Sequence, residues 1–192
     1  AGVNHIEGHV MASFLSDEKP QFPFIALVVS GGHTNVYLVN DYHQFCRLGQ
    51  TRDDAAGEAL DKAARLLGLG YPGGVIIDKL SVNGNPEAYD FPRAMKDSSD
   101  FSFSGLKTAV RYKIAGVGKV DCASVGIPEQ MVADLAASFQ AAVVDCLVGK
   151  AMEALRLTRL GTLCVGGGVA ANRCFRDAIE KAAEKRKVRL YV

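Results

Sequence analysis

The sequence lacks the features that would assign it to several broad classes of protein. Its five cysteines, Cys46, Cys122, Cys146, Cys164 and Cys174, form no C-x-x-C pair, which argues for free thiols in a reducing compartment. No apolar run approaches the roughly 20 residues that span a membrane, and no signal peptide is visible. The 22 basic and 21 acidic residues give no basic excess, so any contact with RNA would need a local patch. A cytoplasmic globular protein without a membrane partner is therefore expected.

The patterns that are present alternate between strands and helices, which predicts an α/β fold. Residues 24–29 read as a buried strand, and a turn at residues 30–34 leads to a second strand at residues 36–39. This hairpin predicts a mixed sheet. Further strands are expected at residues 44–48 and 163–165. The first three helices are expected at residues 5–15 with Asn4 as cap, from Asp53 or Asp54 to residue 69, and at residues 75–82. Three more are expected at residues 104–114 with Ser104 as cap, from Pro128 through Leu155, and up to residue 185 with Asn172 as cap.

Two histidines stand four residues apart in the segment His-Ile-Glu-Gly-His at residues 5–9. On a helix, His5 and His9 would share one face with Cβ atoms about 5–6 Å apart. That spacing lets two imidazoles bind one cation, although two surface or capping histidines would show the same spacing. Glu7 stands midway between them, unlike the glutamate of either zinc-protease motif, which argues against a metalloprotease. Two histidines alone leave a metal ion with an incomplete set of ligands.

Two glycine-rich turns each follow an apolar strand. The first is Ser-Gly-Gly-His-Thr at residues 30–34, and the second is Gly-Gly-Gly at residues 166–168, ahead of the helix capped by Asn172. Such turns present backbone N–H groups without a Cβ in the way, and glycines before a helix are a general arrangement for binding phosphate. The first turn alone could equally be an ordinary hairpin turn, and neither matches the P-loop or the G-x-G-x-x-G motif. Together they predict a nucleotide held between two walls.

Charged residues gather in two further places. Asp54, Glu58 and Asp61 fall at helical spacing and are expected to share a side, where a cation or sugar hydroxyls would relieve their repulsion. A solvated acidic face is the alternative. The basic residues within 181–189 offer either a candidate RNA contact or a solvated helix face.

Six strings of residues resemble one family closely when they are taken together and in order. They are NHIEGH, ALVVSGGHT, DDAAGEALDK, GYPGG, FSFSGLKTAV and GGGVAANR, and they span residues 4–173. The family is the universal tRNA threonylcarbamoyladenosine transferase, formerly called O-sialoglycoprotein endopeptidase. Val28 stands where archaeal and eukaryotic relatives have Tyr, and His33 where they have Asn, which is typical of the bacterial and organellar branch.

The resemblance implies an actin-like ATPase fold built from two ribonuclease-H-like lobes with a cleft between them. Residues 1–23 would then be a remnant helix and linker of the N-terminal lobe, and residues 24–192 a truncated C-terminal lobe with a mixed sheet flanked by helices. The chain begins without Met inside a helix pattern and stops within a strand pattern at residues 187–192, so both ends are expected to be missing.

The resemblance also implies an activity and its residues. The activity is transfer of threonylcarbamoyl from threonylcarbamoyl-AMP to the N6 amine of the adenosine beside the anticodon, in tRNAs that read ANN codons. His5 and His9 match the metal pair, for iron or zinc, and the third ligand is an Asp in a C-T-D-N motif outside these residues. No catalytic residue is assigned, and Glu7 is a candidate general base. The positions that match those holding the nucleotide, either threonylcarbamoyl-AMP or ATP, are Val28, Val29, Ser30, Gly31, Gly32, Asp61, Gly74, Asp78 and Asn172.

The implied partners are tRNA, a bacterial paralogue (TsaB-like) and an ATPase (TsaE-like). Because one metal ligand and the N-terminal lobe are absent, the segment alone is expected to be inactive. Three alternatives remain. A catalytically dead paralogue or scaffold of the same complex would lack the histidine pair, a metallopeptidase would place its glutamate differently, and a sugar or acetate kinase of the same fold would hydrolyse ATP without needing the histidines.

Overall fold

The computed structural model describes residues 5–15, 17–115 and 127–192, so the predicted cap Asn4, Cys122 and the rest of segment 116–126 lie outside the described residues. Along the chain, the elements are α1 (His5–Met11), the 3-10 helix η1 (Ala12–Leu15), β1 (Phe24–Val29), β2 (Thr34–Asp41), β3 (Gln44–Gln50), α2 (Ala56–Leu66), α3 (Gly73–Leu80), the 3-10 helix η2 (Ser81–Asn83), α4 (Ser104–Ala115), α5 (Glu129–Thr158), β4 (Thr162–Gly166), the 3-10 helix η3 (Gly168–Ala171), α6 (Arg173–Arg186) and β5 (Arg189–Tyr191).

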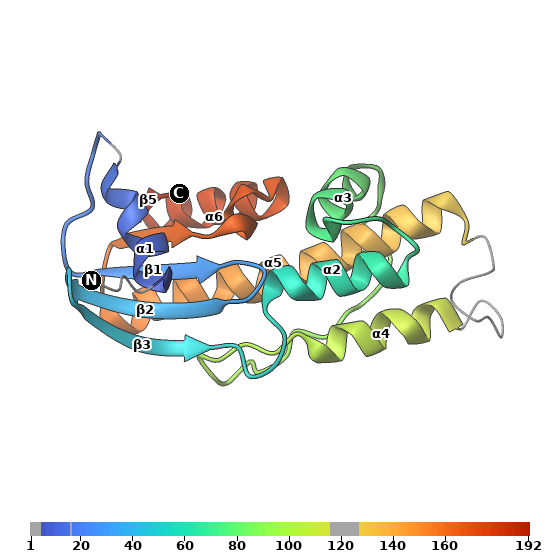
Figure 1. Cartoon of the computed structure of the whole chain (residues 1–192), viewed down its shortest axis with the longest axis horizontal. Coiled ribbons are helices and arrows are strands. Elements are labelled where there is room, and N and C mark those ends of the chain that lie inside the picture. Colours follow the sequence, from blue (N-terminus) through green and yellow to red (C-terminus); the bar gives the residue numbers. More distant parts are fainter. Residues whose placement is uncertain (1–4, 16, 116–126) are drawn as a thin grey trace.

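The strands form one five-stranded sheet in the order β3-β2-β1-β4-β5 (Figure 1). β1 and β2 are antiparallel, with Val29 opposite Thr34, and β2 pairs with β3 in the same way. β4 lies parallel to β1 with Val28 opposite Gly166, and β5 lies parallel to β4. The predicted hairpin and mixed sheet are therefore confirmed. Because β1 and β4 are parallel neighbours, the glycine turns that follow them emerge at the same edge of the sheet.

Each face of the sheet is covered by its own hydrophobic core. Successive side chains of a strand point to opposite faces. Leu27 and Val29 of β1 join the large core with α2 and α5, whereas Val28 joins a smaller core with Val10 of α1. Figure 1 shows α1 in front of β1 and α5 behind the sheet. Every residue of β1 is buried, and each large apolar side chain there contributes about 1.5–3 kcal/mol relative to exposure.

Helix α5 is the longest element and supplies one wall of the large core. It begins after Pro128 and ends at Thr158, and the next residue, Arg159, has the left-handed backbone φ of 58°. Its predicted apolar face is confirmed, because Leu135, Phe139 and Leu147 are all buried. By length and composition α5 could cross a membrane, which the search for apolar runs did not anticipate. However, 67% of its most apolar stretch is buried, as in the core helix of a globular protein, so this is weak evidence for a span.

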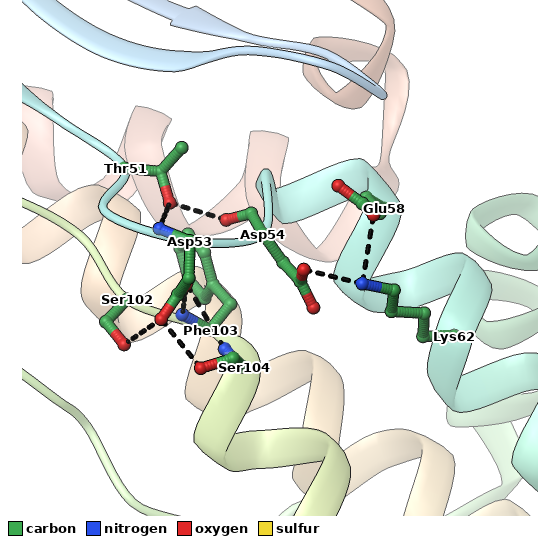
Figure 2. A network of polar contacts seen from close by, with 8 residues as sticks. All are labelled: Thr51, Asp53, Asp54, Glu58, Lys62, Ser102, Phe103 and Ser104. Carbon is green, nitrogen blue, oxygen red and sulfur yellow. Dashed lines mark hydrogen bonds and ion pairs between the residues drawn. The ribbon is translucent and has the colours of Figure 1, made fainter.

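Two predicted helix starts differ from the structure, and a third helix is capped by a residue other than the predicted one. α2 begins at Ala56, not at Asp53 or Asp54. The carboxylate of Asp53 instead accepts the N–H of Phe103 at 2.8 Å and of Ser104 at 3.3 Å, where α4 begins (Figure 2). The hydroxyls of Ser102 and Ser104 also donate to this carboxylate, so Ser104 opens α4 but Asp53 holds its end. α3 starts at Gly73, two residues earlier than the prediction at 75.

Four of the five cysteines fall in the described residues, and Cys46, Cys146, Cys164 and Cys174 are all free thiols there. The expectation of unpaired cysteines is confirmed for these four. The predicted cap of the last helix is also confirmed, because the side chain of Asn172 accepts the N–H of Phe175 at 2.9 Å.

Candidate functional site

Five of the predicted nucleotide-binding residues line one pocket. This glycine-turn pocket has a volume of about 270 Å³, and its lining includes Gly31, Asp61, Gly74, Asp78 and Asn172. The residues come from the turn after β1, from α2 and α3, and from the end of the second glycine turn. They are distant in sequence, and the parallel pairing of β1 with β4 brings the two turns together.

Close packing of α2 against α3 fixes Asp61 in this pocket. One carboxylate oxygen of Asp61 accepts the N–H groups of Gly73 at 2.8 Å and Gly74 at 3.3 Å, which lie in the first turn of α3. A Cβ at Gly73 would lie 2.6 Å from that of Ala64 and 2.7 Å from the Cα of Asp61, so only glycine fits. The glycines of the GYPGG string therefore set the distance between the two helices.

Asp78 and Asn172 are held by a buried side chain that the sequence did not single out. Gln140 of α5 is 1% exposed, donates to Asp78 at 3.2 Å and to Ser81 at 2.9 Å, and accepts the Asn172 amide at 2.8 Å. Asp78 also accepts the N–H of Arg173 at 3.3 Å. The signal for Gln140 was an amide in the middle of an apolar helix face, where an unpaired polar group would be costly.

The first glycine turn reaches the pocket through its backbone. Ser30 donates its N–H to the carbonyl of His33, and its hydroxyl accepts the N–H of His33 at 3.1 Å. Gly31 and Gly32 are exposed with open space around them. The side chains of Val28 and Val29 are fully buried in the two cores, so any contact that they make with a ligand would use the backbone.

The second glycine turn requires glycine for two reasons. Gly167 has a φ of 100°, which favours glycine, and a Cβ there would lie 2.3 Å from the carbonyl oxygen of Val29. At Gly166 a Cβ would lie 2.6 Å from the carbonyl oxygen of His9. The same glycines thus let this turn approach β1 on one side and α1 on the other.

His5 and His9 face each other on α1. Their Nε2 atoms are 3.2 Å apart. Two nitrogens bound to one zinc ion at about 2.0–2.1 Å would lie about 3.0 Å apart at a right angle and about 3.4 Å apart at the tetrahedral angle. The pair therefore fits one shared ion, although a hydrogen bond between the rings gives the same distance. The ring of His33, which sequence reasoning did not assign to this place, lies 6.0 Å from that of His5 between centroids.

No third ligand completes this pair. Across residues 5–15, 17–115 and 127–192, no group of three His, Cys, Asp or Glu side chains is placed to hold a metal ion. Glu7 lines neither the glycine-turn pocket nor the neighbouring pocket that includes His9. Its negative charge influences the pKa of Tyr37. Burial raises the pKa of Tyr37, Arg47 opposes this, and Glu7 adds to the rise.

The three acidic residues at helical spacing do not act as one group, which corrects the sequence interpretation. Lys62 lies between two of them, 2.5 Å from Asp54 and 2.9 Å from Glu58 (Figure 2). The hydrogen bond from Lys62 lowers the pKa of Glu58. Asp61 is turned toward Gly73 and the pocket. The repulsion is therefore relieved within the chain by an ammonium group.

The fold is an α/β lobe of the actin-like ATPase type, with a ribonuclease-H-like mixed sheet flanked by helices. Full-length HypF, in a phosphate- and nucleotide-bound crystal structure, superposes with a TM-score of 0.70 at 13% identity over 98% of this chain and 39% of that one. HypF from T. kodakarensis gives a TM-score of 0.67 at 14% identity, over 94% of this chain and 32% of that one. At these identities the likeness concerns the fold alone.

Comparison of the sequence with protein families gives the particular family. The TsaD family, described as tRNA N6-adenosine threonylcarbamoyltransferase, matches residues 1–192. The chain belongs to this family. A relative with that name from Methylibium petroleiphilum is 52% identical, and the match covers 99% of this chain and 53% of the relative. Another, from Syntrophus aciditrophicus, is 48% identical, and the match covers 100% of this chain and 55% of the relative. A third, from Desulfitobacterium hafniense, is 51% identical over 97% and 54%. The chain spans about half the length of these relatives.

Proposed function

We propose that the protein transfers threonylcarbamoyl from threonylcarbamoyl-AMP to the N6 amine of the adenosine beside the anticodon, in tRNAs that read ANN codons. The relatives' shared name supports the transfer. The observation that carries the proposal is that Gly31, Asp61, Gly74, Asp78 and Asn172 line one pocket. This pocket is joined to the histidine helix through the second glycine turn, which packs against His9.

The glycine-turn pocket would hold the nucleoside part of the donor. Its two carboxylates, Asp61 and Asp78, can accept hydrogen bonds from ribose hydroxyls or from the adenine amine. One oxygen of Asp61 is already occupied by Gly73 and Gly74, so the carboxylate is fixed before the ligand arrives. The backbone N–H groups of the glycine turns would bind the phosphate.

The reaction needs an activated carbonyl and an amine held against it. The N6 amine would attack the carbamoyl carbon, the bond from this carbon to the phosphate oxygen would break, and AMP would leave with the electron pair while the amine gives up one proton. We assign no residue as the base. His5 and His9 would hold one divalent ion, iron or zinc, with a third ligand outside this chain, and such an ion supplies Lewis-acid polarisation of an oxygen.

We further propose a cytoplasmic location, with tRNA, a TsaB-like paralogue and a TsaE-like ATPase as partners. The histidine pair disfavours the catalytically dead paralogue, and the position of Glu7 midway between the two histidines disfavours a metallopeptidase. Because the chain spans about half the length of its relatives and offers two metal ligands, we expect the isolated 192-residue segment to be inactive.

The test uses a protein of the relatives' full length that contains these residues, incubated with threonylcarbamoyl-AMP and an unmodified tRNA transcript. His5→Ala should abolish the modified nucleoside, measured by mass spectrometry after digestion. His43→Ala is the matched control, because His43 is exposed in the turn between β2 and β3. Undiminished product from the His5 variant would exclude the histidine role, and absence of product from the unmodified sequence would exclude the proposed reaction.

A further inference from the structure

A second pocket lies on the other side of the second glycine turn. It has a volume of about 510 Å³, and its lining includes His9, Ser13, Gly167, Ala171, Arg176 and Tyr191. We call it the arginine pocket. Ala171 lines both this pocket and the glycine-turn pocket, so the segment from Gly166 to Asn172 forms the wall between them. The two pockets are therefore neighbours that share this segment of the chain.

The two pockets differ in charge. The glycine-turn pocket is lined by Asp61 and Asp78, and none of its described lining residues is Lys, Arg or His. The arginine pocket is lined by Arg176 and His9 and has no acidic lining residue among those described. A carboxylate would be repelled by the first pocket and attracted by the second.

Arg176 is an exposed side chain that forms no ion pair with the described residues. Among the described residues, three arginines form ion pairs, Arg52 with Asp100, Arg93 with Asp145 and Arg156 with Glu153, and Arg176 is one of several arginines that do not. In the described part of the chain, no carboxylate or carbonyl pairs with the guanidinium of Arg176. It lies in the first turn of α6, which begins at Arg173 after the Asn172 cap. A guanidinium presents donors in a planar fork that matches a carboxylate.

The transferred group named in the family's activity contains such a carboxylate. Threonylcarbamoyl is the carbamoyl derivative of threonine's amine, so the α-carboxylate of threonine remains free and charged. A transferase that encloses this group must satisfy the charge, because a carboxylate removed from water without a partner is costly.

We propose that Arg176 binds the α-carboxylate of the threonyl group in the arginine pocket while the nucleoside occupies the glycine-turn pocket. This assignment rests on the proposed function. Arg176 is thereby the residue that selects a carboxylate-bearing acyl group over one without it. It acts on binding and takes no part in the transfer of protons.

The test measures binding of three ligands by calorimetry, again in a protein of the relatives' full length. They are a non-hydrolysable threonylcarbamoyl-adenylate, the same compound with threonine replaced by 1-amino-2-propanol, and AMP. Arg176→Gln should weaken binding of the first by about tenfold to a hundredfold, because charge-assisted hydrogen bonds are lost. Binding of the other two should be unchanged. Lys185→Gln is the matched control on α6, where Lys185 is exposed, and Arg176→Lys should give an intermediate loss.

The unmodified sequence offers a check that does not depend on any variant. It should bind the carboxylate compound at least about tenfold more tightly than the amino-alcohol compound. Equal affinity for these two compounds, or an equal loss for all three ligands in the Arg176 variant, would overturn the assignment of Arg176. If the unmodified sequence binds AMP but neither acyl compound, the proposed function itself fails and the assignment fails with it.

Discussion

Replacing Gln140 with leucine should lower both the stability of the fold and its affinity for nucleotide. Gln140 is 1% exposed and makes three side-chain hydrogen bonds, to Asp78, Ser81 and Asn172. A neutral hydrogen bond contributes about 0.5–1.5 kcal/mol net, and one to a charged group about 1.5–3 kcal/mol. Leucine fills a similar volume but leaves these groups unpaired, so the expected loss is about 2–5 kcal/mol.

The same substitution removes the link between two residues of the glycine-turn pocket. Without Gln140, Asp78 and Asn172 lose a common support from α5. Because a misplaced carboxylate cannot accept a ligand hydroxyl at the right distance, nucleotide affinity should fall about tenfold or more. Stability is measured by urea denaturation and affinity by calorimetry with AMP.

The control for this experiment lies on the same helix. Gln130 is exposed, and its amide donates to Asn83 and Asp134 among the described residues, so Gln130→Leu should change stability by less than about 1 kcal/mol and leave AMP affinity unaltered. The reasoning is refuted if the Gln140 variant unfolds within about 0.5 kcal/mol of the unmodified sequence and binds AMP equally well.

Two further substitutions test the cap on α4 and the packing of α2 against α3. Asp53→Ala should destabilise the protein by about 0.5–2 kcal/mol through loss of the cap on α4, measured by urea denaturation. Burial acts to raise the pKa of Asp53, but hydrogen bonds from Ser102, Ser104 and Phe103 outweigh it and leave the pKa below its usual value. The stabilisation by the Asp53 carboxylate is therefore present above the pKa of the unfolded carboxyl, about 3.9, and is lost as the pH falls through the lower pKa of the folded state. If the Asp53 variant shows the same acid unfolding curve as the unmodified sequence, this pH dependence is contradicted. Gly73→Ala should cost about 1–3 kcal/mol and weaken AMP binding, because the added Cβ meets Asp61 and Ala64, whereas Gly105→Ala, which meets nothing within 4 Å, should be tolerated.

Much of the local structure could be predicted from the sequence because it depends on neighbouring residues. The apolar run at β1 and the glycine turn after it predicted the hairpin, and the helical spacing along α5 predicted its buried face. The cap at Asn172 was predicted for the same reason, since a cap bonds an N–H only three residues away. Boundaries were less certain where a side chain bonds a distant segment, as Asp53 does at the start of α4.

The composition of the site was predictable only through the resemblance to a family. Asp61, Gly74 and Asp78 carry no pattern that distinguishes a pocket from a solvated helix, and the acidic trio was interpreted as one face. Lys62 satisfies two of these carboxylates, so the structure separates Asp61 from them.

By itself the sequence determined which segments are strands and helices, where glycine is needed for a turn, and that two imidazoles share one face of a helix. Only the tertiary structure decided which of these features meet. The parallel pairing of β1 with β4 places Val28 opposite Gly166, and this brings the two glycine turns and the histidine helix to one edge of the sheet. The positions of Gln140 and Arg176 beside the pockets likewise depend on tertiary packing. The spacing of side chains within one element follows from the period of a helix or strand. Contacts between distant segments depend on which faces of the elements pack together, and this cannot be predicted from a short stretch of sequence.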